Sequence, residues 1–281
     1  MITVEVPEYF SLNKIADSGQ CFNWTQIGDN TYSIIIDTNY IEVRQHDNYM
    51  DLSCDKIMFD TYWEHYFDLH NTSHIYQNIA NHINPNDKFM LSAYEYGKGI
   101  YILHQPFFET LISYIISQRK SIPAIKTCLT KIREKFGTKM HGYDLNGNNI
   151  EYYTFPSAKI LSNISEDRLK DCGVGYRAKY IIDASVWASS FKNLLSLIQL
   201  NQLSKSTNEM ITLLKTINGV GDKVANCIAL FALHRLDACP IDVWINKIIT
   251  DDYHCETVDW LTDKYAGLLQ QYAFYYKRHL N

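Results

Sequence analysis

The stretch GVGDKVANCIALFALHRLDACPIDVW, residues 219–244, decides the fold of this chain of 281 residues. The run MITLLKTI at 210–217 places apolar residues at helical spacing, NGVGD interrupts that run, and KVANCIALFAL at 223–233 resumes it. Two amphipathic runs separated by a glycine-containing turn predict a helix-hairpin-helix motif.

The turn of this hairpin suits a phosphate group. Gly219 and Gly221, with Val220 between them, let the backbone turn tightly and let its N–H groups approach an anion without a Cβ in the way. The second helix adds the positive end of its dipole. We therefore expect these three residues to hold the DNA backbone without reading sequence; an ordinary helical hairpin is the alternative.

Two charged residues follow the glycines. Lys223 lies in the first turn of the second predicted helix, where the positive end of the helix dipole disfavours an ammonium group. Asp242 follows Pro240 at the start of the next apolar run, so both charges can reach the same end of the helix pair. Taken singly, Lys223 can be a solvated surface lysine, and Asp242 can be a helix N-cap.

A lysine and a carboxylate beside a DNA clamp suit attack at a sugar carbon. The carboxylate stabilises the cationic sugar as the base departs, and the amine then holds C1′ as a Schiff base. β-Elimination from that intermediate nicks the strand. A purely hydrolytic enzyme needs Asp242 but not Lys223.

The hydrophobic pattern divides the chain into two parts. Residues 1 to about 60 alternate apolar and polar side chains, which predicts an antiparallel sheet; the runs are at 32–36, 40–45 and 49–54. Beyond them the spacing is helical, at 107–118, 124–136, 178–191 and 259–280, and 142–153 is interpreted as a polar connector. We predict an α+β fold: a β-rich N-terminal domain with linking helices (1–100), then an all-α body with the C-terminal helix (101–281).

Composition limits the class of protein. A hydrophobic content of 46% with 20% charged residues is typical of a soluble globular chain, and no apolar run nears the roughly 18 residues of a membrane span. The seven cysteines are scattered without a C-x-x-C pair, which favours reduced thiols in a cytoplasm and no zinc ribbon. Only Cys255 follows Asp242, which excludes a four-cysteine iron–sulfur site there. We expect no metal and no cofactor in the site.

The net charge of −5 counts mildly against nucleic acid, but the basic residues cluster at 118–126, 131–135 and 176–180. Such clusters fit a DNA-facing surface, and solvated helix faces are the alternative.

The segment from the hairpin to Asp242 resembles the HhH-GPD superfamily of DNA glycosylases, and within it the bacterial-type 8-oxoguanine DNA glycosylase/AP lyase family. The resemblance implies that Lys223 is the nucleophile and Asp242 the catalytic carboxylate. It implies that Cys227 forms a wall of the base pocket, beside Pro240. It also implies a monomer that repairs oxidised double-stranded DNA at the nucleoid.

Two further segments resemble the parts of this family that hold the flipped base: SGQCFNW at 18–24 and YAGLLQQYAF at 265–274. In the first, the resemblance implies that the carbonyl of Gly19 accepts the hydrogen that oxidised guanine carries on N7, and that Gln20 beside it also contacts the base. In the second, Gln270 reads the base edge and Phe274 stacks on the ring. Guanine lacks that N7 hydrogen, so one carbonyl can discriminate between the two bases.

The segment GVGYRAKY at 173–180 resembles the helix start that wedges into the duplex, which assigns that role to Tyr176 and Arg177. A base that is flipped out of the stack leaves a gap, and Tyr176 can fill it.

The chain departs from the animal enzymes where they read the opposite cytosine. Arg119, Lys120 and Ser121 replace asparagines, Ala124 replaces an arginine, and Trp244 replaces a histidine. We expect Arg119, Lys120 and Trp244 to contact DNA, and opposite-base selectivity to be relaxed.

The sequence therefore predicts a bifunctional enzyme of base excision repair, an 8-oxoguanine DNA N-glycosylase with AP lyase activity. Two alternatives stay open: a monofunctional alkylpurine glycosylase of the same superfamily, and a non-catalytic helix-hairpin-helix DNA-binding protein.

Overall fold

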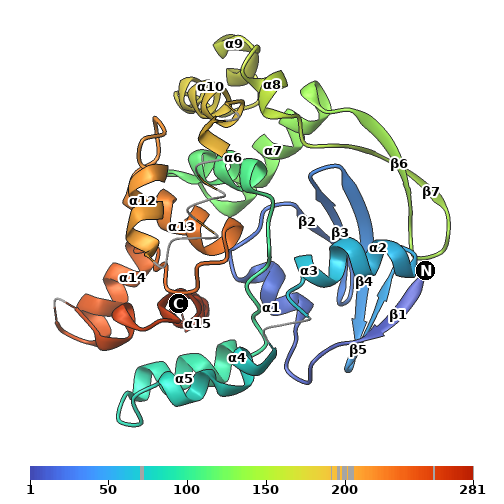
Figure 1. Ribbon diagram of the computed structural model, residues 1–281. Helices are drawn as coiled ribbons and strands as arrows, with labels where there is room; N and C mark the ends of the chain where they lie inside the picture. The colour runs from blue at the N-terminus through green and yellow to red at the C-terminus, as the bar shows by residue number, and fades with distance from the viewer. Residues whose placement is uncertain are drawn as a thin grey trace.

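A computed structural model describes residues 1–69, 73–190, 192–194, 197, 201, 206–255 and 257–280. Its N-terminal part is an antiparallel sheet in the order β1-β5-β4-β3-β2 (Figure 1). The strands are β1 (Ile2–Glu5), β2 (Trp24–Gly28), β3 (Thr31–Ile36), β4 (Asn39–His46) and β5 (Tyr49–Leu52). The predicted N-terminal antiparallel sheet is confirmed.

Alternation and tight turns explain the sheet. In β3 every second side chain is buried, and Ile34 of this strand lies opposite Ile41 of β4. Asp37 and Asp47, which lie between consecutive strands, have positive φ values of 54° and 50°, a conformation that Asp tolerates in hairpin turns. One face therefore lies against the core along the whole of β3 and at Ile41 and Val43 of β4.

Five of the helices that the structure describes accompany the strands and lead into the body. They are α1 (Leu12–Asp17), α2 (Lys56–Met58), α3 (Glu64–Tyr66), α4 (Ser73–Asn78) and α5 (Lys88–Gly97). Trp24 of β2 donates from Nε1 to the hydroxyl of Tyr66 at 2.8 Å, which fastens α3 to the sheet.

The body is helical, as predicted. Its helices are α6 (Phe107–Ser117), α7 (Ile122–Phe136), α8 (Ala158–Leu161), α9 (Glu166–Lys170), α10 (Arg177–Ala188), α12 (Thr207–Leu214), α13 (Asp222–Ala232), α14 (Val243–Lys247) and α15 (Ala266–Leu280). The run predicted at 259–280 divides, since a 3₁₀ turn at Asp259–Thr262 precedes α15. Residue 191, the end of another predicted helix, lies outside the described residues. Among the described residues, no helix combines the length and the apolar character that crossing a membrane requires.

Helix α6 is the centre of the body. Residues 109–116 of this helix are all buried, and Tyr114 stacks on Phe231 of α13 with ring centroids 5.6 Å apart. Glu109 pairs with Arg133 of α7 and accepts a hydrogen bond from the backbone N–H of Asp37 at 2.8 Å. The sheet and the helical body are therefore joined through α6.

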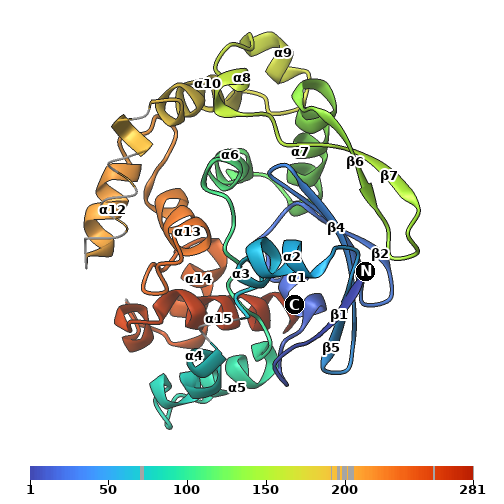
Figure 2. The ribbon, with the colours of Figure 1, turned by 45° about the vertical axis from the view of Figure 1, so that its right-hand side comes forward.

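The C-terminal helix returns to the N-terminal part of the chain. Helix α15 packs against α5, and Figure 2 shows the two side by side near α4. Near its end Arg278 and His279 both contact the carboxylate of Asp17, the last residue of α1. These contacts bring the loop after α1 next to α15.

The prediction of a polar connector at 142–153 is wrong. Residues Lys139–Tyr143 (β6) and Asn149–Tyr153 (β7) form an antiparallel hairpin. The carboxylate of Asp144 accepts from the backbone N–H groups of Asn146 and Asn148, and Gly147 takes a φ of 82°, so polar residues make the turn. Tyr152 then stacks on Tyr40 of β4 at 5.2 Å, which places the hairpin against the sheet.

Candidate active site

The helix-hairpin-helix consists of α12, the turn at 215–221 and α13. Gly219 has a φ of 86°, and a Cβ on it would lie 2.5 Å from Cγ of Tyr180, so only glycine fits here. Its carbonyl accepts from Nε2 of Gln118 at 3.0 Å, which ties the turn to the end of α6. Val220 is buried, and Gly221 is the N-cap of α13. The hairpin of the sequence prediction is therefore present.

Beside the hairpin lies a cleft of about 640 Å³. Lys223 enters it from the first turn of α13, and Asp242 enters it from the N-cap of α14. Most of the residues that the sequence assigned to the base or to catalysis line this one cleft: Gly19, Cys227, Pro240, Gln270 and Phe274 join the two charged residues.

Asp242 is an N-cap, as one alternative supposed. Its Oδ1 accepts from the backbone N–H groups of Trp244 and Ile245, both at 3.0 Å. Because the cap uses Oδ1 alone, it holds the side chain in the cleft and does not consume the second carboxylate oxygen. Capping and a catalytic role are therefore compatible in this geometry.

Lys223 lies against aromatic and thiol groups at the back of the cleft. Its Nζ is 5.0 Å from the ring centroid of Tyr114. Burial raises the pKa of the Cys227 thiol; the Lys223 ammonium opposes this rise, and the Asp242 carboxylate adds to it. Because both charges act on one buried thiol, Lys223 and Asp242 flank Cys227 from two elements.

The loop after α1 and helix α15 form the opposite wall. Gly19 has a φ of 78°, and a Cβ on it would lie 3.2 Å from Cε1 of Phe274. The hydroxyl of Tyr114 donates to the carbonyl of Gln20 at 3.0 Å and lies 3.5 Å from that of Gly19. The backbone at Gly19 is therefore in contact with the Phe274 ring.

Gln20 differs from the expectation that it contacts the base. Its side chain is fully buried: Nε2 donates to the carbonyl of Tyr101 at 2.9 Å, and Oε1 accepts from the N–H of Leu103 at 2.9 Å. An amide used in this way holds the loop rather than a ligand. The flanking sequence does not reveal this role, because both partners lie far along the chain.

Helix α15 supplies two residues that sequence reasoning missed. The guanidinium of Arg278 lies 5.7 Å from the Phe274 ring centroid and pairs with Asp17. Gln271 donates from Nε2 to Oε1 of Gln270 at 3.0 Å, and both residues line the cleft. Positions 270, 274 and 278 share one helix face at a spacing of four residues, the signal that would have found Arg278.

Three residues that are expected to face DNA line the cleft: Arg119, Lys120 and Trp244. Arg119 is exposed at the mouth of the cleft with a φ of 52°, and Trp244 lines the cleft as well. Lys120 lines the cleft and donates from Nζ to the carbonyl of Gly173 at 3.0 Å. All three side chains therefore lie at the cleft, and their contact with DNA stays a prediction.

Tyr176 and Arg177 differ from each other. Tyr176 is 56% exposed, as a side chain that fills a gap in a duplex must be. Arg177 is buried: it donates to the carbonyls of Val174 and Gln118 and lies over the Tyr176 ring at 4.4 Å. The Arg177 side chain therefore holds the loop that carries Tyr176, and its contact with DNA stays a prediction.

Comparison with known proteins agrees with this geometry. Residues 2–111 match the 8-oxoguanine DNA glycosylase N-terminal domain, and residues 112–264 match the family of HhH-GPD superfamily base excision DNA repair proteins. An N-glycosylase/DNA lyase of Saccharomyces cerevisiae is 34% identical over 163 residues, 56% of this chain and 42% of that protein. The chain thus spans about half the length of the curated relatives it matches.

Solved structures extend the likeness over the whole chain. The 8-oxoguanine glycosylase/lyase of Clostridium acetobutylicum, in complex with double-stranded DNA that has cytosine opposite 8-oxoG, is 31% identical with a TM-score of 0.85. That match covers 100% of this chain and 99% of the other. A 3-methyladenine DNA glycosylase of Archaeoglobus fulgidus, 16% identical over 100% of both chains with a TM-score of 0.73, shares the fold alone.

Proposed function

The chain belongs to the HhH-GPD superfamily of base excision DNA repair proteins, with an 8-oxoguanine DNA glycosylase N-terminal domain, and we propose that it excises 8-oxoguanine from duplex DNA and nicks the strand. One observation carries the proposal. Lys223 and Asp242 line the same cleft as Gly19 and Phe274, so the reacting groups and the base-holding groups share one space. The partner is double-stranded DNA with oxidised guanine, bound by a monomer in the cytoplasm.

The reaction begins with the flipped nucleotide in the cleft and Tyr176 in the gap it leaves. The amine nitrogen of Lys223 forms a bond to C1′ as the bond from C1′ to N9 breaks, and the departing base takes that electron pair and the proton that the attacking nitrogen releases. Asp242 faces the positive charge that develops on the sugar. The bond from C1′ to the ring oxygen then breaks, the oxygen takes up a proton from solvent, and the Schiff base forms; removal of a C2′ proton expels the 3′ phosphate.

Cys227 suits this chemistry as a neutral wall. Burial raises the pKa of its thiol, so it stays protonated near neutral pH and does not hold Lys223 in a thiolate–ammonium pair. The neutral sulfur and the Phe274 ring are the two faces between which a flat purine can be held.

The carbonyl of Gly19 supplies the discrimination. 8-Oxoguanine donates from N7–H, whereas guanine presents an acceptor at N7. With guanine in the cleft this carbonyl loses the hydrogen bond to the base and faces an acceptor, at a cost of about 1–3 kcal/mol, which is about 5- to 150-fold in favour of the oxidised base.

Borohydride trapping on a duplex that contains 8-oxoguanine tests the proposal. Reduction of a lysine Schiff base attaches the protein covalently to the DNA, so the parent chain should be trapped and Lys223→Gln should not. Lys98→Gln is the control, because this lysine lies outside the cleft, where it pairs with Glu95, and the variant should be trapped as the parent chain is.

The alternatives give different results. A monofunctional glycosylase releases the base without a trapped adduct, and a DNA-binding protein releases no base at all. If Lys223→Gln is trapped as well as the parent chain, the nucleophile is another residue.

A further inference from the structure

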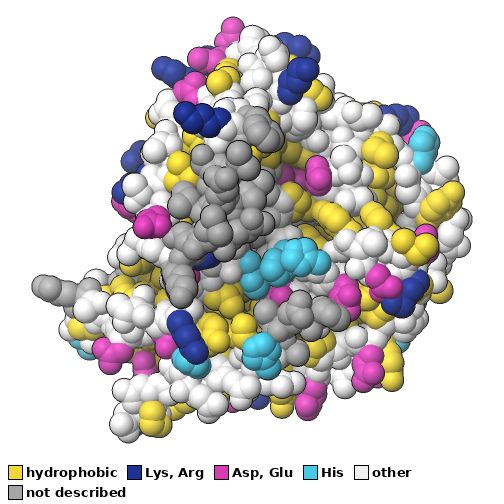
Figure 3. Space-filling model, in the orientation of Figure 1, with side chains coloured by type: hydrophobic (Ala, Val, Ile, Leu, Met, Phe, Trp, Pro, Cys, Tyr) yellow, Lys and Arg dark blue, Asp and Glu magenta, His cyan; other side chains and the backbone are white. Residues whose placement is uncertain are grey.

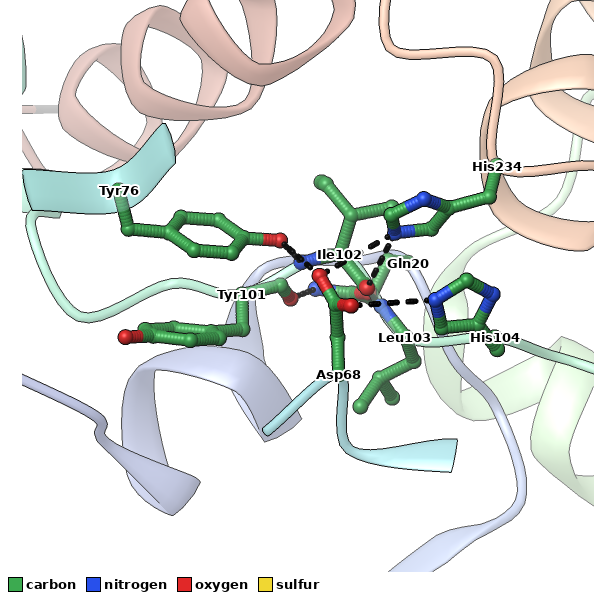
Figure 4. A network of polar contacts seen from close by, with 8 residues as sticks. All are labelled: Gln20, Asp68, Tyr76, Tyr101, Ile102, Leu103, His104 and His234. Atoms are coloured by element: carbon green, nitrogen blue, oxygen red, sulfur yellow. Dashed lines mark hydrogen bonds and ion pairs between the residues drawn. The ribbon is translucent and has the colours of Figure 1, made fainter. Parts of the chain in front are cut away.

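Two histidines and an aspartate meet outside the cleft. Figure 4 shows His104 and His234 both directed at the carboxylate of Asp68. Nε2 of His104 is 3.1 Å from Oδ1 of Asp68, and Nε2 of His234 is 3.3 Å from Oδ2. Figure 3 shows histidine side chains gathered near the middle of this face of the molecule.

The three residues come from separate parts of the chain. Asp68 follows α3, His104 lies in the extended segment before α6, and His234 follows the last turn of α13. Asp68 and His234 both adopt positive φ values, 58° and 52°, so the backbone is turned at each to present the side chain. None of the three lines the cleft that contains Lys223 and Asp242.

Two of the separations, 3.1 and 3.3 Å from the histidine Nε2 atoms to Asp68, are near those around a shared metal ion. The ligand atoms of Asp68, His104 and His234 all lie within 4.8 Å of one another. Tetrahedral zinc, with bonds of about 2.0–2.1 Å to nitrogen and oxygen, holds its ligand atoms about 3.3–3.4 Å apart. Two imidazoles and a carboxylate are a donor set that suits zinc and its first-row neighbours.

The hydroxyl of Tyr76 orients the Asp68 carboxylate. The hydroxyl of Tyr76 donates to Oδ2 of Asp68 at 2.8 Å and accepts from the N–H of Ile102 at 2.9 Å. Tyr76 is itself stacked on Tyr101 at 3.8 Å. Metal-binding carboxylates are ordinarily held by outer partners of this kind, which fix the oxygen positions before the ion arrives.

The histidine rings lie against one another. His104 is stacked between His65 and His234, with ring centroids 4.0 and 3.7 Å away. Nε2 of His234 also lies 3.2 Å from the carbonyl oxygen of Ile102, which can only accept a hydrogen bond. Metal binding through this nitrogen therefore moves the ring proton of His234 to its second nitrogen, which points away from Asp68 in Figure 4.

We propose that Asp68, His104 and His234 bind one divalent first-row transition-metal ion, with zinc the ion that this donor set favours. For both lone pairs to meet one ion, the rings rotate out of their parallel stack about the Cβ–Cγ bond, a torsion with broad wells. Side-chain exposures of 20% for His104 and 13% for His234 leave room for a water as fourth ligand.

The ion has a structural consequence for the base pocket. It joins the end of α3 and the loop after α13 to the segment at 101–105. That segment holds Gln20, whose side chain bonds to Tyr101 and Leu103 and whose carbonyl accepts from Nε2 of Gln105 at 2.8 Å. Gln20 adjoins Gly19, so the ion stiffens the support of the carbonyl that faces the base.

Metal titration of the chelator-treated full chain tests this site. Zinc should bind with a stoichiometry of about one, and saturating zinc, at about a hundred times its dissociation constant, should raise Tm by about 5 °C or more. His104→Gln and His234→Asn keep a polar side chain but should weaken zinc binding more than tenfold and abolish the shift. Cobalt(II) should give visible d–d absorption with no thiolate band, since no cysteine belongs to the site.

Two further variants separate ligation from general loss of structure. His82→Asn is the matched control, because His82 also contacts a carboxylate, Asp263, at 3.1 Å with similar exposure, and it should bind zinc as the parent does. Tyr76→Phe keeps all three ligands and removes only the hydroxyl behind Asp68, so its affinity should fall about tenfold or more.

Four results would overturn the proposal: no stoichiometric zinc binding by the parent chain, undiminished binding by both histidine variants, loss of binding in His82→Asn, or a cobalt–thiolate band. None of these readouts uses DNA, so the metal site and the glycosylase activity fail or stand separately.

Discussion

Replacing Asp242 with asparagine removes a charge and keeps a cap. In the structure Oδ1 of Asp242 accepts from the N–H groups of Trp244 and Ile245, both at 3.0 Å. The amide oxygen of asparagine can accept the same two hydrogen bonds, so the start of α14 should survive. What disappears is the negative charge in the cleft beside Lys223 and Cys227.

Loss of the charge affects the rate, and loss of the cap affects stability, so the two effects can be measured separately. Removing a preorganised electrostatic partner of a transition state costs about 10²–10³ in rate, so single-turnover release of 8-oxoguanine by Asp242→Asn should fall by that factor. Its Tm should stay within about 2 °C of the parent. Asp242→Ala loses the cap too, which costs about 0.5–2 kcal/mol and lowers Tm by a few degrees, at about 2–4 °C per kcal/mol.

The comparison of the two variants is the critical measurement. Asp242→Asn and Asp242→Ala should have similarly low rates but different Tm values. A folded Asp242→Asn protein with parental kinetics would reduce Asp242 to a helix cap and refute the assignment of its charge to catalysis.

Three other outcomes follow from the cleft. Phe274→Ala should weaken binding of a flipped base by about 1–3 kcal/mol while binding of an abasic analogue changes less, and equal losses in the two titrations would make Phe274 a core residue. Gly19→Ala puts a Cβ 3.2 Å from the Phe274 ring at a φ of 78°, which strains the backbone by about 1–2 kcal/mol. Excision of 8-oxoguanine should therefore slow, and the preference of the enzyme for 8-oxoguanine over guanine should decrease; an unchanged preference would mean that Gly19 does not read the base. Because Ala124 offers no donor to the opposite base and Arg119 is exposed, excision opposite T, G and A should approach that opposite C more closely than in the animal enzymes; a preference for C beyond about a hundredfold, near 2.7 kcal/mol, in single-turnover rates on the four duplexes would show that cytosine is read directly.

The sequence by itself determined the local elements. Alternation at 32–36 and 40–45 indicated strands, because side chains on a strand point to opposite faces with a period of two. The glycines at 219 and 221 marked the hairpin, since they allow a turn and a close approach of the backbone. Lys223 and Asp242 could be placed at helix starts, because a helix start depends on residues within about one turn of it.

The polar residues of the turn at 144–148 were visible in the sequence, but the sequence analysis assigned them to a connector rather than to a β-hairpin. The segment at 142–153 is rich in Asn and Gly, and those residues build the loop of a β-hairpin. The strands on either side are recognisable only once Tyr152 is seen against Tyr40, because a two-stranded hairpin is marginal until one face is covered.

The tertiary structure decided which residues meet. Gly19 lies against Phe274 because the end of α15 returns to α1, and Asp68 meets His104 and His234 because three loops converge. The packing also buries the Gln20 side chain, whose hydrogen-bond partners, Tyr101 and Leu103, lie far along the chain. Local propensity extends over a few residues, whereas these contacts depend on how whole elements pack, and so packing rather than sequence neighbourhood decided the composition of each site.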